Sequence, residues 1–113
     1  MQYIDTVQLV QIARGNKDSM MKYLGQFEKL IPERIEALKA QIEQEDRKGV
    51  RQILHQMSPQ LQFFGVPGVV EPIQRLATAY KTIPIEDLKK QVHFVIHQLE
   101  HARTDVRKLM ESL

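Results

Sequence analysis

The sequence predicts an all-α protein: an antiparallel up-down four-helix bundle with a short N-terminal helix. Apolar residues recur at spacings of three and four along almost the whole chain, and alternating β-branched runs are few. Four amphipathic segments are joined by connections of about two to six residues, and such short connections favour antiparallel neighbours. Because 113 residues suffice for one core and not for two, residues 1–113 are expected to form a single domain.

The short first helix is predicted for residues 6–13. Asp5 precedes it and is a suitable N-cap, because its carboxylate can accept the unpaired N–H groups of the first turn. Gly15 follows it and can adopt the left-handed conformation that ends many helices. This helix is too short to join the bundle as an equal member, so it is expected to cover one end or side.

The second helix is predicted to begin after Asn16 or Asp18 and to run to about Gln44. Pro32 lies inside this segment. A proline has no N–H to donate, so the carbonyl of Glu28 loses its helical partner. The sequence therefore predicts a long helix that bends near Glu28.

Three further helices complete the predicted bundle. The third is capped by Asp46 and closes at Gly65, and the fourth spans residues 67–81, where Pro72 either kinks the helix or marks its true start. The fifth begins near Pro84 and runs to the C-terminus. Its apolar seam alternates steps of three and four: Leu88, Val92, Val95, Leu99, Ala102, Val106, Leu109 and Leu113.

Composition excludes several classes of function. A net charge of +2, with basic residues interspersed among acidic ones, does not indicate nucleic-acid binding. No apolar run approaches the ~20 residues of a membrane span, so no membrane insertion is expected. The N-terminus lacks the pattern of a secretory signal, which predicts a cytoplasmic location. The absence of cysteine excludes disulfides and thiolate metal sites.

His55 is the candidate functional residue, because it lies on the polar side of the third helix. On a helical wheel with Leu54 at zero, the apolar residues Val50, Met57, Leu61 and Phe64 fall between about −20° and −80°. His55 falls near about +100°, roughly 145° from the centre of that face. An imidazole exposed on a rigid helix is a suitable acceptor of a phosphoryl group.

Cationic and small or neutral polar residues surround His55 on the wheel. They are Lys48, Arg51, Ser58, Pro59 and Gln62. Lys48 and Arg51 lie about two turns and one turn before His55, where they can attract a phosphate, although solvated surface cations have the same pattern. Gln62 is placed to hydrogen-bond the imidazole or simply to face water. The predicted environment of the acceptor consists of the four polar residues, Lys48, Arg51, Ser58 and Gln62.

These residues resemble the histidine-containing phosphotransfer (HPt) domains of multistep two-component relays, and the resemblance covers most of the chain. HPt domains usually carry a lysine three residues after the histidine and a glycine four residues after it. Here those two positions hold Ser58 and Pro59. The residues that match the family pattern are Asp18, Phe27, Pro32, Ile35, Leu38, Asp46, His55 and Gly65.

The resemblance implies a phosphorelay intermediate rather than a kinase. His55 would accept a phosphoryl group from a receiver-domain aspartate and pass it to another receiver. The partners would be receiver domains of response regulators or hybrid sensor kinases. The receiver would supply Mg²⁺, so the protein is expected to need no cofactor and no ATP site of its own. HPt domains are usually monomers, and the same is expected here.

Pro59 and Phe63 are the candidate docking residues. Pro59 removes the helical partner of the His55 carbonyl, so a bend or widened turn is expected at the acceptor. Proline is also compact and would let a receiver approach closely. Phe63 falls near about 180° on the wheel, opposite the apolar face. It is expected either to be exposed as a docking anchor or to pack under the first helix.

A metal site is the first alternative. His93, His97 and His101 are spaced four residues apart and form a line on the fifth helix, and two histidines four apart can share a zinc ion. No third ligand is fixed nearby except Glu100, and the line lies on the outer face. The sequence therefore predicts no metal site.

Two further alternatives concern His55. In the phospho-accepting helix pair of sensor kinases, an acid directly follows the histidine and a proline lies five residues later. Here Gln56 follows His55, Pro59 is four residues later, and no nucleotide-binding domain is present. The other alternative is a helical protein-interaction module in which His55 is incidental. Phosphorylation of His55 by a receiver would separate a relay from such a module.

Overall fold

A computed structural model describes residues 3–113; residues 1 and 2, which belong to the predicted domain, lie outside the described residues. Within the described part there are five helices and no strand. The prediction of an all-α bundle with a short N-terminal helix is confirmed. The helices are α1 (Val7–Ala13), α2 (Lys17–Glu43), α3 (Arg47–Phe63), α4 (Pro67–Ala79) and α5 (Ile85–Ser112).

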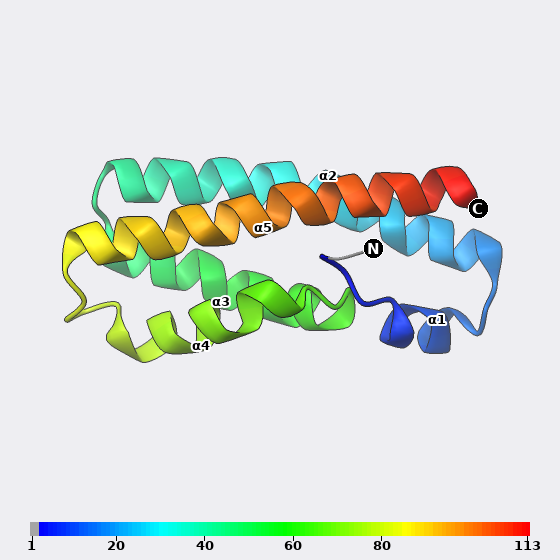
Figure 1. The fold of residues 1–113 in the computed structure, drawn as a ribbon, viewed down its shortest axis with the longest axis horizontal. Coiled ribbons are helices and arrows are strands. Elements are labelled where there is room, and N and C mark those ends of the chain that lie inside the picture. The colour runs from blue at the N-terminus through cyan, green and yellow to red at the C-terminus, as the bar shows by residue number, and fades with distance from the viewer. Residues whose placement is uncertain (1–2) are drawn as a thin grey trace.

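The four long helices run antiparallel to their chain neighbours in an elongated bundle of 45 × 21 × 20 Å (Figure 1). Long α2 and α5 lie side by side, and the shorter α3 and α4 pack beneath them (Figure 1). At one end α2 and α5 extend beyond α3 and α4. The short α1 lies there and packs against α2 (Figure 1). None of the described helices combines the length and the apolar character that a bilayer span requires.

The first two helices follow the predicted boundaries closely. The N-cap of α1 is Thr6 rather than Asp5, but the Asp5 carboxylate still accepts the N–H of Val7 at 3.0 Å. Asn16 caps α2 by accepting the N–H of Ser19 at 2.9 Å. Of the two predicted starts, Asn16 is therefore the correct one. Through Pro32 the helix continues without a break, and the bend expected there stays a prediction.

In the second half of the bundle, the structure shows whether Pro72 lies inside the fourth helix or marks its start. Asp46 caps α3 as predicted, by accepting the N–H of Gly49 at 2.9 Å. Pro67 occupies the first turn of α4, and Pro72 is buried inside that helix, so the alternative start at Pro72 is wrong. The chain leaves α4 at Ala79, two residues before the predicted end.

The core is built from the apolar faces of all five helices. The predicted seam of α5 is buried from Leu88 to Val106, and its last two members, Leu109 and Leu113, are partly buried against the core. Asp105 is the buried charged residue within the described part of the chain, and its carboxylate accepts the N–H of Tyr3 at 2.9 Å. This bond ties the N-terminal segment to α5.

Candidate functional site

His55 is exposed on α3, as the helical wheel predicts. Its neighbours Leu54 and Met57 on the opposite face are each only 2% exposed. Burying a side chain of this size stabilises the fold by roughly 1.5–3 kcal/mol, so both residues hold α3 firmly against the bundle. The imidazole is thus presented to solvent from a helix that packing keeps in place.

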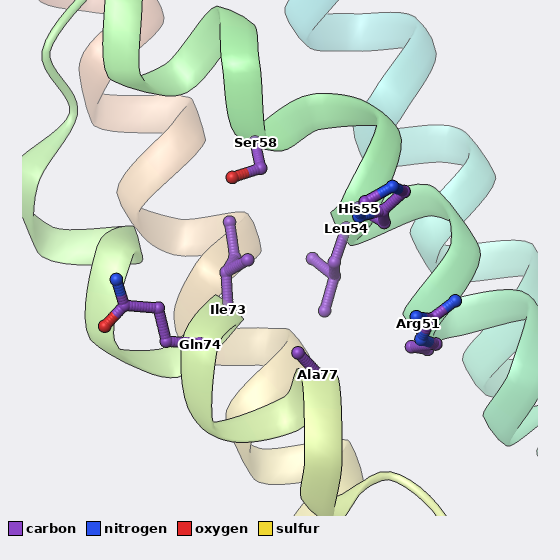
Figure 2. Close-up of a pocket in the computed structure, with 7 residues that line it drawn as sticks. All are labelled: Arg51, Leu54, His55, Ser58, Ile73, Gln74 and Ala77. Atoms are coloured by element: carbon purple, nitrogen blue, oxygen red, sulfur yellow. The ribbon is translucent and has the colours of Figure 1, made fainter.

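A pocket lies beside His55, between α3 and α4 (Figure 2). Its volume is about 130 Å³. None of the side chains that line it is acidic, and one carries a permanent positive charge. The lining residues are Arg51, Leu54, His55 and Ser58 from α3, and Ile73, Gln74 and Ala77 from α4. The described lining therefore presents one cation and no carboxylate beside His55.

The structure separates the four polar residues predicted around the acceptor into two pairs. Arg51 and Ser58 are partly buried and line the pocket. Lys48 and Gln62 are exposed and lie outside it. Arg51 and His55 project from the same side of α3, one turn apart, whereas the Ser58 hydroxyl points toward α4 (Figure 2). Of the two predicted cations, Arg51 is therefore the one that lines the same pocket as His55.

The α4 side of the pocket was not predicted from sequence. Gln74 and Ala77 are exposed residues of an amphipathic helix, and nothing in their local pattern distinguishes them. Only the packing of α4 against α3 brings them to the pocket beside His55. The Gln74 amide points away from His55 (Figure 2), so its role in this arrangement is to form the wall of the pocket.

Tyr80, at the C-cap of α4, is a further residue that the sequence did not indicate. The Arg51 guanidinium carbon lies 5.7 Å from the centre of the Tyr80 ring, within the range of a cation–π interaction. The Lys81 ammonium lies 5.8 Å from the same ring. Arg47 donates to the carbonyls of Tyr80 and Ile83, which fixes the turn between α4 and α5 to the start of α3.

The two candidate docking residues have different environments. Pro59 is exposed, and α3 continues through it, so the bend expected at this turn stays a prediction. The expectation that Phe63 is exposed is wrong. Its ring is partly buried, 5.7 Å from the Tyr23 ring and 4.8 Å from the Phe64 ring. A helical wheel describes one helix by itself. It therefore misses Tyr23 of α2, whose ring packs against Phe63 on this side of α3.

The line of histidines on α5 contains one close pair. The Nε2 atoms of His97 and His101 are 3.1 Å apart, and the Tyr3 ring stacks on His101 with a centroid distance of 4.6 Å. His93 is exposed and has no such contact. Among residues 3–113, no group of three or more histidine or carboxylate side chains is arranged to hold a metal ion.

Comparisons with known proteins identify the family and a similar fold. The family model described as Hpt domain matches residues 22–110, which include α3 and the pocket. The fold is similar to the crystal structure of the HPT domain of an Hpt sensor hybrid histidine kinase from Shewanella. That similarity has a TM-score of 0.77 at 20% identity and covers 92% of this chain and 90% of the other. No match was found among curated proteins. The match of the family model over most of the chain shows that this chain belongs to the Hpt domain family.

Proposed function

We propose that His55 accepts a phosphoryl group from the aspartyl phosphate of a receiver domain and passes it to the aspartate of a second receiver. Membership of the Hpt family supports a role in histidine phosphotransfer within a phosphorelay. The observation that carries the assignment to His55 is its position, exposed on α3 beside a pocket without acidic side chains. An anionic phosphoryl group meets no like charge from the pocket walls.

The transfer needs little from this chain beyond position. A lone pair on the neutral imidazole attacks phosphorus, the P–O bond to the receiver aspartate breaks, and the carboxylate leaves with the bonding electrons. Phosphoryl transfer depends mainly on in-line geometry and charge neutralisation. A receiver that brings Mg²⁺ supplies most of that neutralisation, so the chain needs no resident cofactor.

Hpt domains are phosphotransfer intermediates rather than ATP-binding kinases, and we propose that this protein acts in the same way. Its partners would be receiver domains of response regulators or hybrid kinases. Residues 1–113 would act as one domain, as a monomer and in the cytoplasm. Lys48, Arg51, Ser58 and Gln62 would form the environment of the acceptor, with the first two attracting the phosphoryl group.

Incubation with a receiver labelled on its aspartate tests the proposal. We expect acid-labile, base-stable label to appear on the protein and to be absent from the His55→Ala variant. His93→Ala is the matched control, because His93 is also an exposed helical histidine and should be dispensable. Label that persists in His55→Ala would contradict the proposal. Stable receiver binding without any label would instead favour an interaction module.

A further inference from the structure

We infer that Arg51 holds the phosphoryl group on His55 and leaves the Tyr80 ring to do so. The inference rests on the proposed function and names the residue that stabilises the phosphorylated form. In the structure, the Arg51 guanidinium lies over the Tyr80 ring at 5.7 Å. Phosphorylation would place a doubly charged group within reach of the same guanidinium. Arg51 would then exchange an aromatic partner for an anionic one.

The backbone places Arg51 within reach of the acceptor. Residues four apart on a helix have Cβ atoms about 5–6 Å apart, and an arginine side chain spans that distance. Both residues line the pocket and project from the same side of α3 (Figure 2). Arg51 is partly buried, so part of its movement is already restricted before a phosphoryl group arrives.

The N–H groups of the Arg51 guanidinium are available to donate hydrogen bonds to a phosphoryl group. Within residues 3–113, the Arg51 guanidinium makes no ion pair with a carboxylate and no hydrogen bond to a protein acceptor. A planar guanidinium can donate two parallel hydrogen bonds to phosphate oxygens, and such charge-assisted bonds are stronger than neutral ones. The Tyr80 ring attracts the positive charge of Arg51 but accepts no such hydrogen bond from its N–H groups. A phosphoryl group is therefore the better partner for Arg51.

Other nearby cations are less suited to this role. Arg47 is engaged with the carbonyls of Tyr80 and Ile83, and Arg75 pairs with Glu71. Lys48 is exposed and outside the pocket, about two helical turns from His55. Ser58 lines the pocket but is uncharged. Arg51 is thus the cation of the pocket that can move to the phosphoryl group.

The phosphotransfer equilibrium measures this interaction directly. For the reaction in which the receiver aspartyl phosphate and free His55 give free aspartate and phosphohistidine, the equilibrium constant depends only on the unbound species. Contacts made during docking change the forward and reverse rates equally and cancel. Loss of a charge-assisted hydrogen bond to the phosphoryl group should lower the constant about tenfold. Loss of the Tyr80 contact should raise it about threefold, because the unphosphorylated form loses a favourable interaction.

The experiment compares wild type with Arg51→Gln, Tyr80→Leu, the double variant and Lys108→Gln, with helical content checked for each. Wild type must first take label on His55, because failure there would refute the proposed function and not this inference. We expect a lower constant for Arg51→Gln, a higher one for Tyr80→Leu, and no effect of Tyr80→Leu in the Arg51→Gln background. Lys108→Gln, which removes the same charge from an exposed position on α5 outside the pocket, should match wild type.

Three results would overturn the inference. An unchanged constant in Arg51→Gln would show that this guanidinium does not hold the phosphoryl group. Equal losses in Arg51→Gln and Lys108→Gln would show that only the general positive charge matters. An unchanged constant in Tyr80→Leu, or a rise that persists without Arg51, would show that the Tyr80 ring does not compete for Arg51.

Discussion

His55 combines exposure with a firmly held backbone, and both properties come from the residues beside it. Leu54 and Met57 anchor the same helix turns in the core, each 2% exposed. Gln56, the next residue, accepts a hydrogen bond from Arg34 of α2 at 3.1 Å. If His55 accepts a phosphoryl group as proposed, this platform favours in-line transfer, because small misplacements slow such reactions greatly.

Pro59 provides a test of the docking surface at the residue scale. It is exposed and lies one turn after His55. Replacing it by glycine, which is also compact, should leave the rate of transfer from a receiver within about twofold of wild type. Replacing it by lysine should slow transfer at least about tenfold, because a long charged side chain would hold the receiver away from His55. Rapid-quench assays of phosphoryl transfer measure both rates. A wild-type transfer rate in Pro59→Lys would refute this prediction.

The turn between α3 and α4 is joined to the N-terminal segment by close backbone packing. Gly65 has a φ of 64°, and its carbonyl accepts the N–H of Asp5 at 2.5 Å. A Cβ at this position would overlap the Asp5 carbonyl oxygen. The family pattern of a glycine ten residues after the histidine thus has a physical cause in this chain. Only glycine permits both the turn and the close approach of the N-terminal segment.

Gly65 and Gly15 form a matched pair for testing whether the close approach of the N-terminal segment requires glycine at position 65. Both have positive φ, at 64° and 70°, but a Cβ at Gly15 would meet no atom within 4 Å. Gly15→Ala should therefore cost about 1 kcal/mol of backbone strain. Gly65→Ala should cost about 3 kcal/mol, since the added methyl group also displaces the N-terminal segment. Urea unfolding of both variants gives the comparison, and equal losses would show that the contact with Asp5 is unimportant.

For the molecule as a whole, the unequal helix lengths matter most. The 27 residues of α2 and the 28 of α5 extend beyond the 17 of α3 and the 13 of α4. Ion pairs join the two long helices to each other. Glu28 of α2 accepts from Arg107 at 2.9 Å and from Arg103 at 3.3 Å on α5. This cluster complements the apolar contacts that hold the long helices together.

The Glu28 cluster predicts how stability depends on pH. The Arg107 hydrogen bond, opposed in part by burial and assisted by Arg103, holds the pKa of Glu28 below its ordinary value of 4.5. Because the pKa is lower in the folded state, the stabilisation is fully present above about pH 4.5 and is lost as the pH falls through the lowered value. Glu28→Gln should lower the free energy of unfolding by about 1 kcal/mol at pH 7.

The measurement is chemical unfolding at pH 7 and at pH 3. The difference between wild type and Glu28→Gln should shrink at the lower pH, because the wild-type carboxylate is then increasingly protonated. Glu33→Gln is the control, since Glu33 is exposed on the same helix and has no ion pair within residues 3–113. A loss in Glu28→Gln that stays constant across this range would contradict an ionic origin.

Much of this protein can be read from spacing along the chain. The period of the apolar residues is enough for the all-α class, for the buried face of α3 and for the exposure of His55, because these depend on one helix at a time. Caps such as Asp46 are equally local. The family pattern also has local parts, since His55 and Gly65 lie on or next to the same helix.

Such local patterns do not predict the contacts between helices. The sequence offers four polar neighbours for His55 without ranking them, whereas packing of α4 on α3 selects Arg51 and Ser58 and adds Gln74 and Ala77. The same packing places Tyr80 against Arg51, and α2 partly buries Phe63. Helical periodicity defines which way a side chain points from its own axis. What it meets there depends on residues distant in the chain, which only the assembled bundle brings together.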